Sequence, residues 1–459
     1  MKKVFIKTYG CQMNERDSEA VAALLRSRGY DLTTAEREAD VILLNTCSVR
    51  DLAEQKAIGK MWTLAALKKR KPELVLGYLG CMAQSRGGAL AKLQPAVDLV
   101  VGTQRFHHVP DYIDAIFAGR EQAVAAYDAE LRAIVDVAEE VGSESTIRDH
   151  VTGTNGDRPV TAFVSIMQGC DMYCSFCIVP FTRGRERSRP IAEIVTEVEQ
   201  LAATGVKEVT LLGQIVTSYG RGMIPKQNGK SVFVQLLEAV QAVPGVERIR
   251  FTSPHPKGFG DDLVAAYRDM PKLCEHAHLP VQSGSNRLLK EMNRGYQREW
   301  YLKIVEKLRS AQPNIAVSTD VIVGYPGETD ADFQETVALL REVEFDQAYI
   351  FKYSPRRDTP AAEAVGQLSE DVKEERNHVA LQVLNEGMAR KHQRLVGQTL
   401  EVLVEGVSTR STERMFGRTR TNKGVVFAGN GRQRGELLPV RIERGSITTL
   451  YGDPAIHNL

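Results

Sequence analysis

The sequence of 459 residues lacks any long apolar run and has little net charge. A transmembrane helix needs about 18 or more consecutive apolar residues, and no stretch approaches that length. The N-terminus (MKKVFIK) passes directly into a strand-like pattern without the apolar segment of a cleavable signal. With 43% hydrophobic residues, 25% charged residues and a net charge of +1, the composition is typical of a soluble globular protein. We therefore expect a cytoplasmic protein with no membrane segment.

Cysteine is also scarce. The chain has seven cysteines, an odd number whose spacing does not suit a small module held by disulfides. The chain is longer than one hydrophobic core usually supports, so two or three domains are expected. Six of the cysteines fall into two groups of three, which favours metal or redox chemistry over disulfide bonding.

The first 145 residues alternate strand-like and helix-like segments. An amphipathic helix is predicted at residues 17–28, where Gly29 would end it. Four apolar runs with the character of buried strands lie at residues 4–9, 41–45, 74–79 and 98–102. This alternation predicts a Rossmann-like parallel α/β domain over residues 1–145.

Three cysteines of this region occupy equivalent places. Cys11, Cys47 and Cys81 each follow one of the first three predicted strands, about 35 residues apart, which fits one β-α-β unit each. The carboxyl ends of parallel strands share one edge of a sheet, so the three thiols should meet there. Three buried structural cysteines are the alternative. Three thiolates without an evident fourth ligand suit an iron-sulfur cluster with one open iron better than a closed zinc site.

A polar stretch at residues 142–157 is predicted to be a linker or lid. The motif with the most cysteines follows it. Residues 168–177 (QGCDMYCSFC) contain Cys170, Cys174 and Cys177, spaced four and three apart. Such a loop can ligate three irons of a four-iron cluster and leave the fourth iron open for a small molecule. A zinc knuckle is the alternative, but it would need a fourth ligand nearby, and residues 178–190 offer no cysteine or histidine.

The central region, residues 146–388, repeats strand and helix patterns. The strand candidates are residues 160–167, 209–212, 248–251, 276–279, 316–323 and 348–353. Six such units predict a partial (β/α)6 barrel, and active sites of such barrels lie at the carboxyl ends of the strands. The candidates at those ends are Gln214, Ser253, His255, Gln282, Ser283, Ser285, Asp320 and Tyr353. His276 and His278 share one strand face and are predicted to be packed barrel residues rather than metal ligands.

The last segment, residues 389–459, contains short β-type runs separated by Gly and Asn. Residues 391–459 contain 11 Lys or Arg but 6 Asp or Glu. A small basic β-barrel on a nearly neutral protein is typical of a nucleic-acid module, and a structural barrel with a solvated basic face is the alternative. Arg418 and Arg420 are predicted to contact RNA phosphates. Arg183 and Arg185, which follow the second cysteine group, are predicted to contact phosphates or bases of the RNA.

The three regions, taken in order, resemble the radical S-adenosylmethionine methylthiotransferase family. The resemblance rests on both cysteine groups, on residues 8–14 (TYGCQMN), 179–186 (VPFTRGRE) and 319–329 (TDVIVGYPGET), and on a C-terminal part that is similar to the TRAM domain. It implies that Cys11, Cys47 and Cys81 hold an auxiliary 4Fe-4S cluster. Cys170, Cys174 and Cys177 would hold the 4Fe-4S cluster that binds S-adenosylmethionine, and all six would take part in catalysis.

The resemblance also implies a reaction and a set of partners. Within the family, the motifs look most like the branch that methylthiolates carbon 2 of N6-isopentenyladenosine at position 37 of tRNA, beside the anticodon. Phe176, Gln214, Ser253, Asp320 and Tyr353 would contact S-adenosylmethionine, and Gln12 and Asn14 would contact the substrate. The expected partners are a tRNA anticodon stem-loop and a flavodoxin-like or ferredoxin-like electron donor, and the enzyme is expected to be a monomer.

Other interpretations share part of this pattern. A methylthiotransferase for threonylcarbamoyladenosine in tRNA, or for an aspartate of a ribosomal protein, would carry the same two cysteine groups. An RNA-binding protein with purely structural clusters would keep the C-terminal barrel but would not need an open iron. One departure from the family pattern is that Ile215 and Thr217 stand where relatives usually have asparagines, which puts a polar role of those two positions in doubt.

Overall fold

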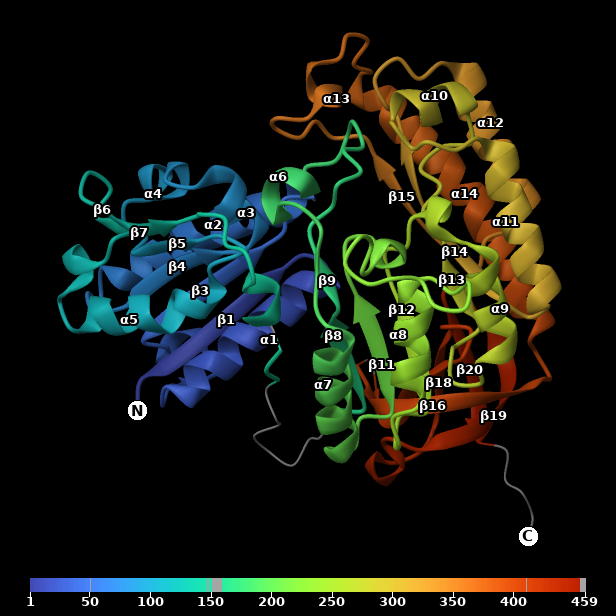
Figure 1. Ribbon diagram of the computed structural model, residues 1–459, viewed down its shortest axis with the longest axis horizontal. Helices are drawn as coiled ribbons and strands as arrows, with labels where there is room; N and C mark the ends of the chain where they lie inside the picture. The colour runs from blue at the N-terminus through green and yellow to red at the C-terminus, as the bar shows by residue number, and fades with distance from the viewer. Residues whose placement is uncertain (50, 147, 151–158, 410, 455–459) are drawn as a thin grey trace.

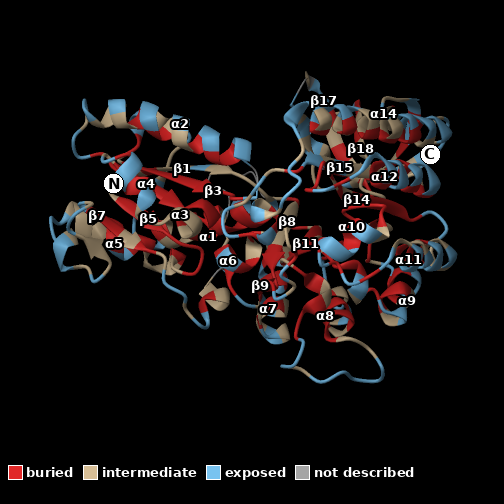
Figure 2. Cartoon of the chain, turned by 90° about the horizontal axis from the view of Figure 1, so that it is seen from above, coloured by how far each residue is buried: buried red, intermediate tan, exposed pale blue. Residues whose placement is uncertain are grey.

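The computed structural model describes residues 1–49, 51–146, 148–150, 159–409 and 411–454. They form an N-terminal α/β unit, a central partial barrel and a small C-terminal β-barrel (Figure 1). Buried residues follow the strands and the inward sides of the helices in Figure 2. Part of the polar stretch at residues 142–157 lies outside the described residues. No helix in the described ranges is long and apolar enough to cross a membrane.

The N-terminal unit is a seven-stranded sheet in the order β2-β1-β3-β4-β5-β7-β6. All neighbouring pairs are parallel except β6 with β7. Its strands are β1 (Lys3–Tyr9), β2 (Asp31–Leu32), β3 (Val41–Thr46), β4 (Val75–Leu79), β5 (Leu99–Val101), β6 (Tyr127–Asp128) and β7 (Ala133–Asp136). The four predicted strands are confirmed. The strands β2, β6 and β7 were not predicted, because they have only two, two and four residues.

Helices cover both faces of this sheet, as the apolar character of β3 and β4 requires. The helices α1 (Gln12–Ser27) and α5 (Val109–Phe117) bury one face, through residues such as Val21 and Ile113. The other face is covered by α2 (Asp51–Lys68), α3 (Cys81–Arg86) and α4 (Ala89–Leu93), through Met61 and Met82 among others. The first helix begins five residues before its predicted start, directly after Cys11.

The central region is the predicted partial barrel of six parallel strands. One sheet has the order β12-β11-β8 and contains β8 (Thr161–Ser165), β11 (Glu208–Leu212) and β12 (Arg248–Phe251). The other has the order β13-β14-β15 and contains β13 (His276–His278), β14 (Ala316–Val323) and β15 (Gln347–Lys352). A parallel bridge between Ile249 and Leu273 brings the two sheets together at β12. The barrel is therefore continuous from β8 to β15 and open between these two end strands.

Helices surround this barrel and share one large apolar core with it. They are α7 (Ile191–Ala203), α8 (Val232–Gln241), α9 (Asp261–Asp269), α10 (Asn286–Glu291), α11 (Arg298–Ala311), α12 (Asp330–Val343), α13 (Pro360–Glu363) and α14 (Glu370–Arg394). The predicted boundary after residue 388 falls inside α14, which runs on to Arg394 before the C-terminal barrel begins.

The N-terminal unit spans the open side of the central barrel. On one edge, Arg16 of α1 forms an ion pair of 3.5 Å with Glu197 of α7. On the other edge, Arg356, which follows β15, donates a hydrogen bond of 2.7 Å to the carbonyl of Val49. Both edges of the opening are thus held against the unit that carries the first cysteine group.

The C-terminal region is a closed five-stranded barrel in the order β16-β17-β18-β20-β19. Its strands are β16 (Thr399–Ser408), β17 (Ser411–Thr419), β18 (Gly424–Ala428), β19 (Leu437–Gly445) and β20 (Thr449–Pro454). It lies below the central barrel in Figure 1, against the amino-terminal ends of the central strands. Arg248 donates to the carbonyl of Arg418 (2.7 Å), and Lys423 pairs with Asp346 (2.8 Å). The C-terminal barrel therefore does not cover the carboxyl ends of the central strands, where the second cysteine group is expected.

Candidate active site

Cys11, Cys47 and Cys81 meet at the carboxyl ends of three adjacent strands, as the sequence predicts. Cys11 is the N-cap of α1 after β1, Cys47 follows β3, and Cys81 is the first residue of α3 after β4. The thiols of Cys11 and Cys47 are close enough to hydrogen-bond, and Cys81 interacts electrostatically with both. Three cysteines that lie far apart in the sequence thereby form one group of three sulfurs.

Two glycines permit this close approach of the three loops. A Cβ on Gly10 would lie 2.6 Å from the Cβ of Cys47, so a side chain there would push the two loops apart. Gly80 has a φ of +89°, and a Cβ on it would lie 2.1 Å from Oδ1 of Asn45. Both positions therefore require glycine.

Asn14 joins these loops and is not a surface residue. Its Oδ1 accepts from the Cys11 thiol (3.3 Å), and its Nδ2 donates to Oδ1 of Asn45 (3.1 Å). The side chain of Asn45 in turn donates to the Asn14 carbonyl (2.9 Å). Asn14 is fully buried, and its contact with the substrate stays a prediction. Gln12, two residues earlier in the same motif, is exposed, and its contact with the substrate stays a prediction.

The surroundings shift the pKa values of the three thiols in different directions. A hydrogen bond from the Cys47 thiol lowers the pKa of Cys11 to about 6, with help from the charge of Arg183. The same pairing and burial raise the pKa of Cys47. Burial raises the pKa of Cys81, while Arg183 opposes that rise. In the free protein only one of the three thiols is therefore favoured as a thiolate. Three neighbouring thiolates repel one another, so a bound cation is needed to keep all three deprotonated.

Arg183 supplies a positive charge to this group from the other side of the domain interface. It ends α6 (Val179–Arg183), the helix directly after the second cysteine group, and its side chain is 2% exposed. Its Nη2 pairs with Oδ2 of Asp17 at 2.5 Å, and Asp17 is fully buried in α1. In this structure the guanidinium lies inside the protein beside the cysteines, and the expected contact of Arg183 with RNA stays a prediction.

We expect Arg183→Met to lower the free energy of unfolding by about 3–5 kcal/mol, because it leaves the buried carboxylate of Asp17 without its cation. Adding Asp17→Asn should recover much of that loss. The matched control is Arg185→Met, two residues on, where the side chain is 80% exposed and the loss should stay below about 0.5 kcal/mol. Urea denaturation of the four proteins measures this, and equal losses at both arginines would contradict it.

The second cysteine group lies in the loop between β9 (Met167–Gln168) and α6. A short antiparallel pairing of β9 with β10 (Arg187–Ser188) closes the base of this loop. Gly169 has a φ of +83°, and a Cβ there would lie 1.9 Å from the carbonyl oxygen of Arg185. The Gly169 N–H donates to Oε1 of Gln214 at 2.7 Å. Gln214 thus holds the start of the loop, and its predicted contact with S-adenosylmethionine stays untested.

Cys170, Cys174 and Cys177 interact with one another inside this loop. Burial raises the pKa of Cys170 to about 12 and that of Cys177 to about 11. The Cys174 sulfur accepts a hydrogen bond of 3.3 Å from Nη1 of Arg294, which is itself 5% exposed. Arg294 was not predicted, because it lies more than 100 residues further along the chain with no motif that links it to the cysteines.

Both cysteine groups fit iron-sulfur clusters. Each offers three buried or half-buried thiols and an arginine from a distant segment, which suits an anionic sulfur-rich group. Nη1 of Arg183 is buried with no hydrogen-bond partner among the described residues, and so are both polar atoms of the Gln168 side chain. A bound group would supply the acceptors and donors that these atoms lack.

The remaining cofactor candidates line the carboxyl ends of the barrel strands. Phe176 packs with Ile322, Tyr325 and Tyr353 in a small apolar cluster beside the cysteine loop. Ser253 follows β12 with a φ of +55°, and Asp320 of β14 lies 3.5 Å from Nε2 of His278. These positions are compatible with a small molecule at the open iron, and the contacts themselves stay predictions.

Three other expectations concern the barrel interior. His276 and His278 both hydrogen-bond to the hydroxyl of Ser318 at 2.9 Å, which agrees with their prediction as packed residues. Ile215 is buried, as an apolar side chain should be. Thr217 keeps a polar role, because its hydroxyl accepts from the backbone N–H of His255 at 3.1 Å.

The predicted RNA-contact arginines of the C-terminal barrel divide into two kinds. Arg418 is 42% exposed and pairs with Glu405 of the same barrel at 2.9 Å. Arg420 reaches into the central region, where it pairs with Glu275 (2.7 Å) and donates to the carbonyl of Leu273 (2.9 Å). Arg420 therefore holds two domains together, and its predicted phosphate contact stays a prediction.

We expect Arg420→Gln to lower the free energy of unfolding by about 1–3 kcal/mol, since it leaves a half-buried carboxylate and a carbonyl without their donor. Arg418→Gln is the control, because a pair within one surface is worth at most about 1 kcal/mol. Thermal and urea denaturation compare the two, and a larger loss for Arg418→Gln would contradict the assignment.

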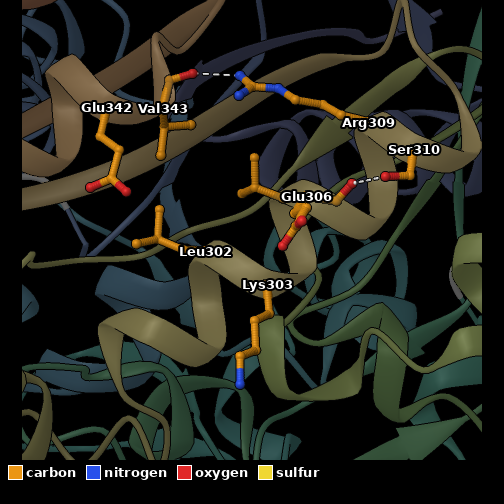
Figure 3. Close-up of a pocket in the computed structure, with 8 residues that line it drawn as sticks. Leu302, Lys303, Glu306, Arg309, Ser310, Glu342 and Val343 are labelled. Carbon is orange, nitrogen blue, oxygen red and sulfur yellow. Dashed lines mark hydrogen bonds between the residues drawn. The ribbon is translucent and has the colours of Figure 1, made fainter.

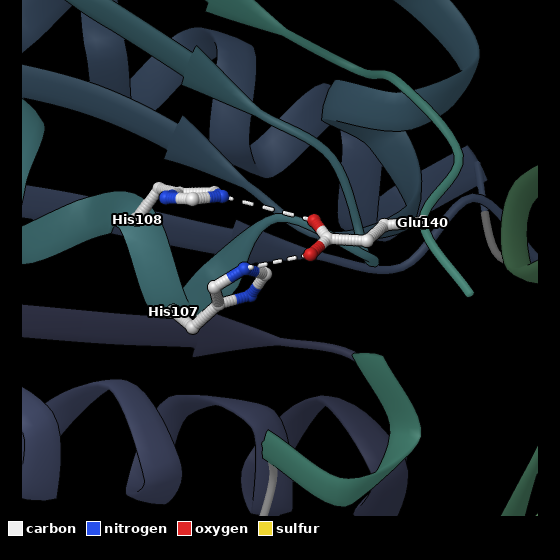
Figure 4. A group of neighbouring side chains, drawn as sticks. All are labelled: His107, His108 and Glu140. Atoms are coloured by element: carbon white, nitrogen blue, oxygen red, sulfur yellow. Dashed lines mark ion pairs between the residues drawn. The ribbon is translucent and has the colours of Figure 1, made fainter. Parts of the chain in front are cut away.

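Two further groups of side chains lie away from both cysteine sites. A surface pocket between α11 and α12 is lined by Leu302, Lys303, Glu306, Arg309 and Glu342, on the outer side of the helices (Figure 3). His107 and His108 approach Glu140 at 3.3 Å and 3.7 Å (Figure 4). Glu140 is also paired with Arg105, which already neutralises it. Neither group contributes to the candidate active site.

Comparison with known proteins covers all three regions. Residues 3–102 match the model described as "Uncharacterized protein family UPF0004", residues 164–340 match the radical SAM superfamily, and residues 393–455 match the TRAM domain. A relative from Opitutus terrae named tRNA-2-methylthio-N(6)-dimethylallyladenosine synthase is 54% identical, over 99% of this chain and 97% of its own. A relative of the same name from Clostridium novyi is 44% identical, over 98% and 96%.

The fold has solved counterparts as well. The radical S-adenosylmethionine methyltransferase TsrM from Kitasatospora setae, solved with cobalamin and a [4Fe-4S] cluster bound, matches with a TM-score of 0.59. The match covers 79% of this chain and 77% of that one at 13% identity, so it shows a shared fold.

Proposed function

Because this chain belongs to the family of tRNA-2-methylthio-N(6)-dimethylallyladenosine synthases, we propose that it methylthiolates carbon 2 of N6-isopentenyladenosine at position 37 of tRNA. The product would be 2-methylthio-N6-isopentenyladenosine. The relatives' identity of 52–54% extends over essentially the whole chain, including both cysteine groups and the C-terminal barrel. The names of these relatives favour this substrate over threonylcarbamoyladenosine or a ribosomal aspartate.

The chemistry of carbon 2 explains the need for two cysteine sites. The C–H bond there is unactivated, and no acid or base of this chain could remove its hydrogen at neutral pH. When bound, two 4Fe-4S clusters and S-adenosylmethionine would supply the radical chemistry and the methylated sulfur. The chain's own residues hold these groups, orient them and exclude water.

Each group of residues has a distinct task in this proposal. Cys170, Cys174 and Cys177 would ligate the cluster that binds S-adenosylmethionine, and Arg294 donates a hydrogen bond to the Cys174 sulfur. The auxiliary cluster would be ligated by Cys11, Cys47 and Cys81. Phe176, Ser253, Asp320 and Tyr353 would contact S-adenosylmethionine at the carboxyl ends of the strands.

One observation carries the proposal above all: the two cysteine sites are joined by a buried ion pair. Asp17 lies six residues after Cys11, and Arg183 lies six residues after Cys177, and their side chains meet at 2.5 Å. A second link runs from Arg356 to Val49, two residues after Cys47. These contacts fix the auxiliary site against the mouth of the central barrel, as a reaction that uses both sites on one substrate requires.

The partners follow from the same assignment. A tRNA anticodon stem-loop would approach the open mouth, where Arg185 is 80% exposed, and Arg418 would contact phosphates further along the RNA. A flavodoxin-like or ferredoxin-like protein would supply electrons. The enzyme would act as a monomer in the cytoplasm.

Substrate discrimination tests this proposal. The anaerobically reconstituted enzyme should modify tRNA that carries N6-isopentenyladenosine and leave tRNA that carries threonylcarbamoyladenosine unchanged. The two tRNAs should be compared in the same reaction with a chemical reductant, so that the electron donor does not limit either. Modification of the threonylcarbamoyl tRNA alone would assign the chain to the other branch.

A further inference from the structure

The last strand of the central barrel carries two exposed aromatic side chains. Tyr349 and Phe351 of β15 are 47% and 38% exposed. Their rings are stacked on each other, with centroids 6.4 Å apart and planes 13° from parallel. Two stacked aromatic rings exposed on a barrel strand are unusual, because strands of such barrels normally bury their apolar side chains.

These rings face the interior of the barrel. In the parallel pairing of β14 with β15, Tyr349 stands opposite Asp320 and Phe351 opposite Ile322, so each pair shares one face of the sheet. The alternate residues Ala348 and Ile350 pack on the core shared with the helices. The Tyr349 ring also lies 6.5 Å from the His278 ring on the inner face of β13.

The position of the pair relates it to both cysteine sites. Ile322, the register partner of Phe351, packs in the same apolar cluster as Phe176 of the second cysteine loop. Beyond the carboxyl end of β15, Arg356 reaches the carbonyl of Val49, near Cys47 of the first group. Because β15 is the last strand of the barrel and borders its open side, the rings lie on the edge of the barrel wall that faces the N-terminal unit.

We propose that Tyr349 and Phe351 form a stacking platform for the adenine base of the target nucleotide, turned out of the anticodon loop. This inference rests on the proposed function. Enzymes that modify a base must take it out of its stack, and they hold the displaced base on aromatic side chains. Aromatic platforms suit every base because each has a π-face, and the imidazole of His278 beside Tyr349 can meet the edge of a purine.

The test uses a short anticodon stem-loop RNA with 2-aminopurine in place of the target adenosine. Fluorescence of 2-aminopurine is quenched by stacking, so binding to the full-length reconstituted enzyme should quench it. The double variant Tyr349→Leu/Phe351→Leu keeps apolar bulk but removes both rings. It should bind the RNA roughly 5- to 150-fold more weakly and lose the quenching, because each stacked base contributes a factor of that order.

Matched controls separate this effect from general damage. Trp62→Leu removes an aromatic ring of α2 that is 53% exposed in the N-terminal unit, and it should change neither affinity nor quenching. Tyr349→Phe keeps the ring and should keep the quenching. If the double variant loses iron or folded structure, Tyr349→Leu alone replaces it, with a smaller loss of affinity and quenching expected.

Two outcomes would overturn the stacking platform, and a third would contradict the proposed function. Leucine variants that bind and quench like the unmodified enzyme would overturn the platform. Loss of S-adenosylmethionine affinity with unchanged RNA affinity would assign the rings to the cofactor and overturn it too. Failure of the unmodified enzyme to bind the stem-loop would contradict the proposed function itself.

Discussion

Replacing Cys170, Cys174 and Cys177 together with alanine is expected to remove about half of the iron and to abolish 5′-deoxyadenosine formation. The reason is that six cysteines form two independent groups of three, each suited to one four-iron cluster. Iron and sulfide content after anaerobic reconstitution, and chromatography of the reaction with a strong reductant, measure the two effects.

The seventh cysteine provides the control for this experiment. Cys274 is buried, at 1% exposed, and interacts with Arg250 at the amino-terminal ends of the barrel strands, away from both groups. Cys274→Ala should therefore retain all the iron and all the 5′-deoxyadenosine formation. Full iron retention in the triple variant would overturn the assignment of that loop.

Replacing Cys11, Cys47 and Cys81 together with alanine is expected to have the complementary effect. Methylthiolation of tRNA should end, while reductive cleavage of S-adenosylmethionine persists, because the second cysteine loop and its contacts with Gln214 and Arg294 remain. The iron content should again fall to about half. Mass spectrometry of the tRNA and of the nucleoside products measures both reactions, and methylthiolated tRNA from this variant would refute the role of the first group.

The strands and both cysteine groups could be predicted from the sequence because their signals are local. Buried parallel strands are short apolar runs, and a cysteine directly after such a run must lie at the shared edge of the sheet. The loop of Cys170, Cys174 and Cys177 is compact enough to be recognised from spacing alone. All six strands of the central barrel were found in this way, within a residue or two at their ends.

The residues that support these sites could not be predicted, since their contacts join distant segments. Arg183 and Asp17 are separated by 166 positions, and Arg294 and Cys174 by 120. An arginine in a basic run is expected at the surface, because the sequence does not show whether it is buried. For this reason RNA contacts were predicted for Arg183 and Arg420. The burial of Asn14 could not be predicted either: Gln12 in the same motif is exposed, but Asn14 points into the loops it joins.

The interface between domains explains why charged residues can be buried where the sequence suggests an exposed surface. Charged residues at a domain boundary pair with partners from the other domain, so their net charge in the sequence overstates the charge that is exposed. Lys423 of the C-terminal barrel pairs with Asp346 of the central region at 2.8 Å, and Lys391 at the end of α14 pairs with the same carboxylate at 2.7 Å. Part of the basic character of the last 69 residues therefore serves domain docking rather than the proposed RNA binding.

The most direct test of the account is the identity of the nucleoside at position 37 after reaction. Anaerobically reconstituted enzyme, S-adenosylmethionine and a reductant are incubated with tRNA that carries N6-isopentenyladenosine, and the digested tRNA is analysed by mass spectrometry. The account predicts 2-methylthio-N6-isopentenyladenosine, with the methyl group derived from S-adenosylmethionine. Unchanged N6-isopentenyladenosine from an enzyme that holds both clusters and forms 5′-deoxyadenosine would contradict it.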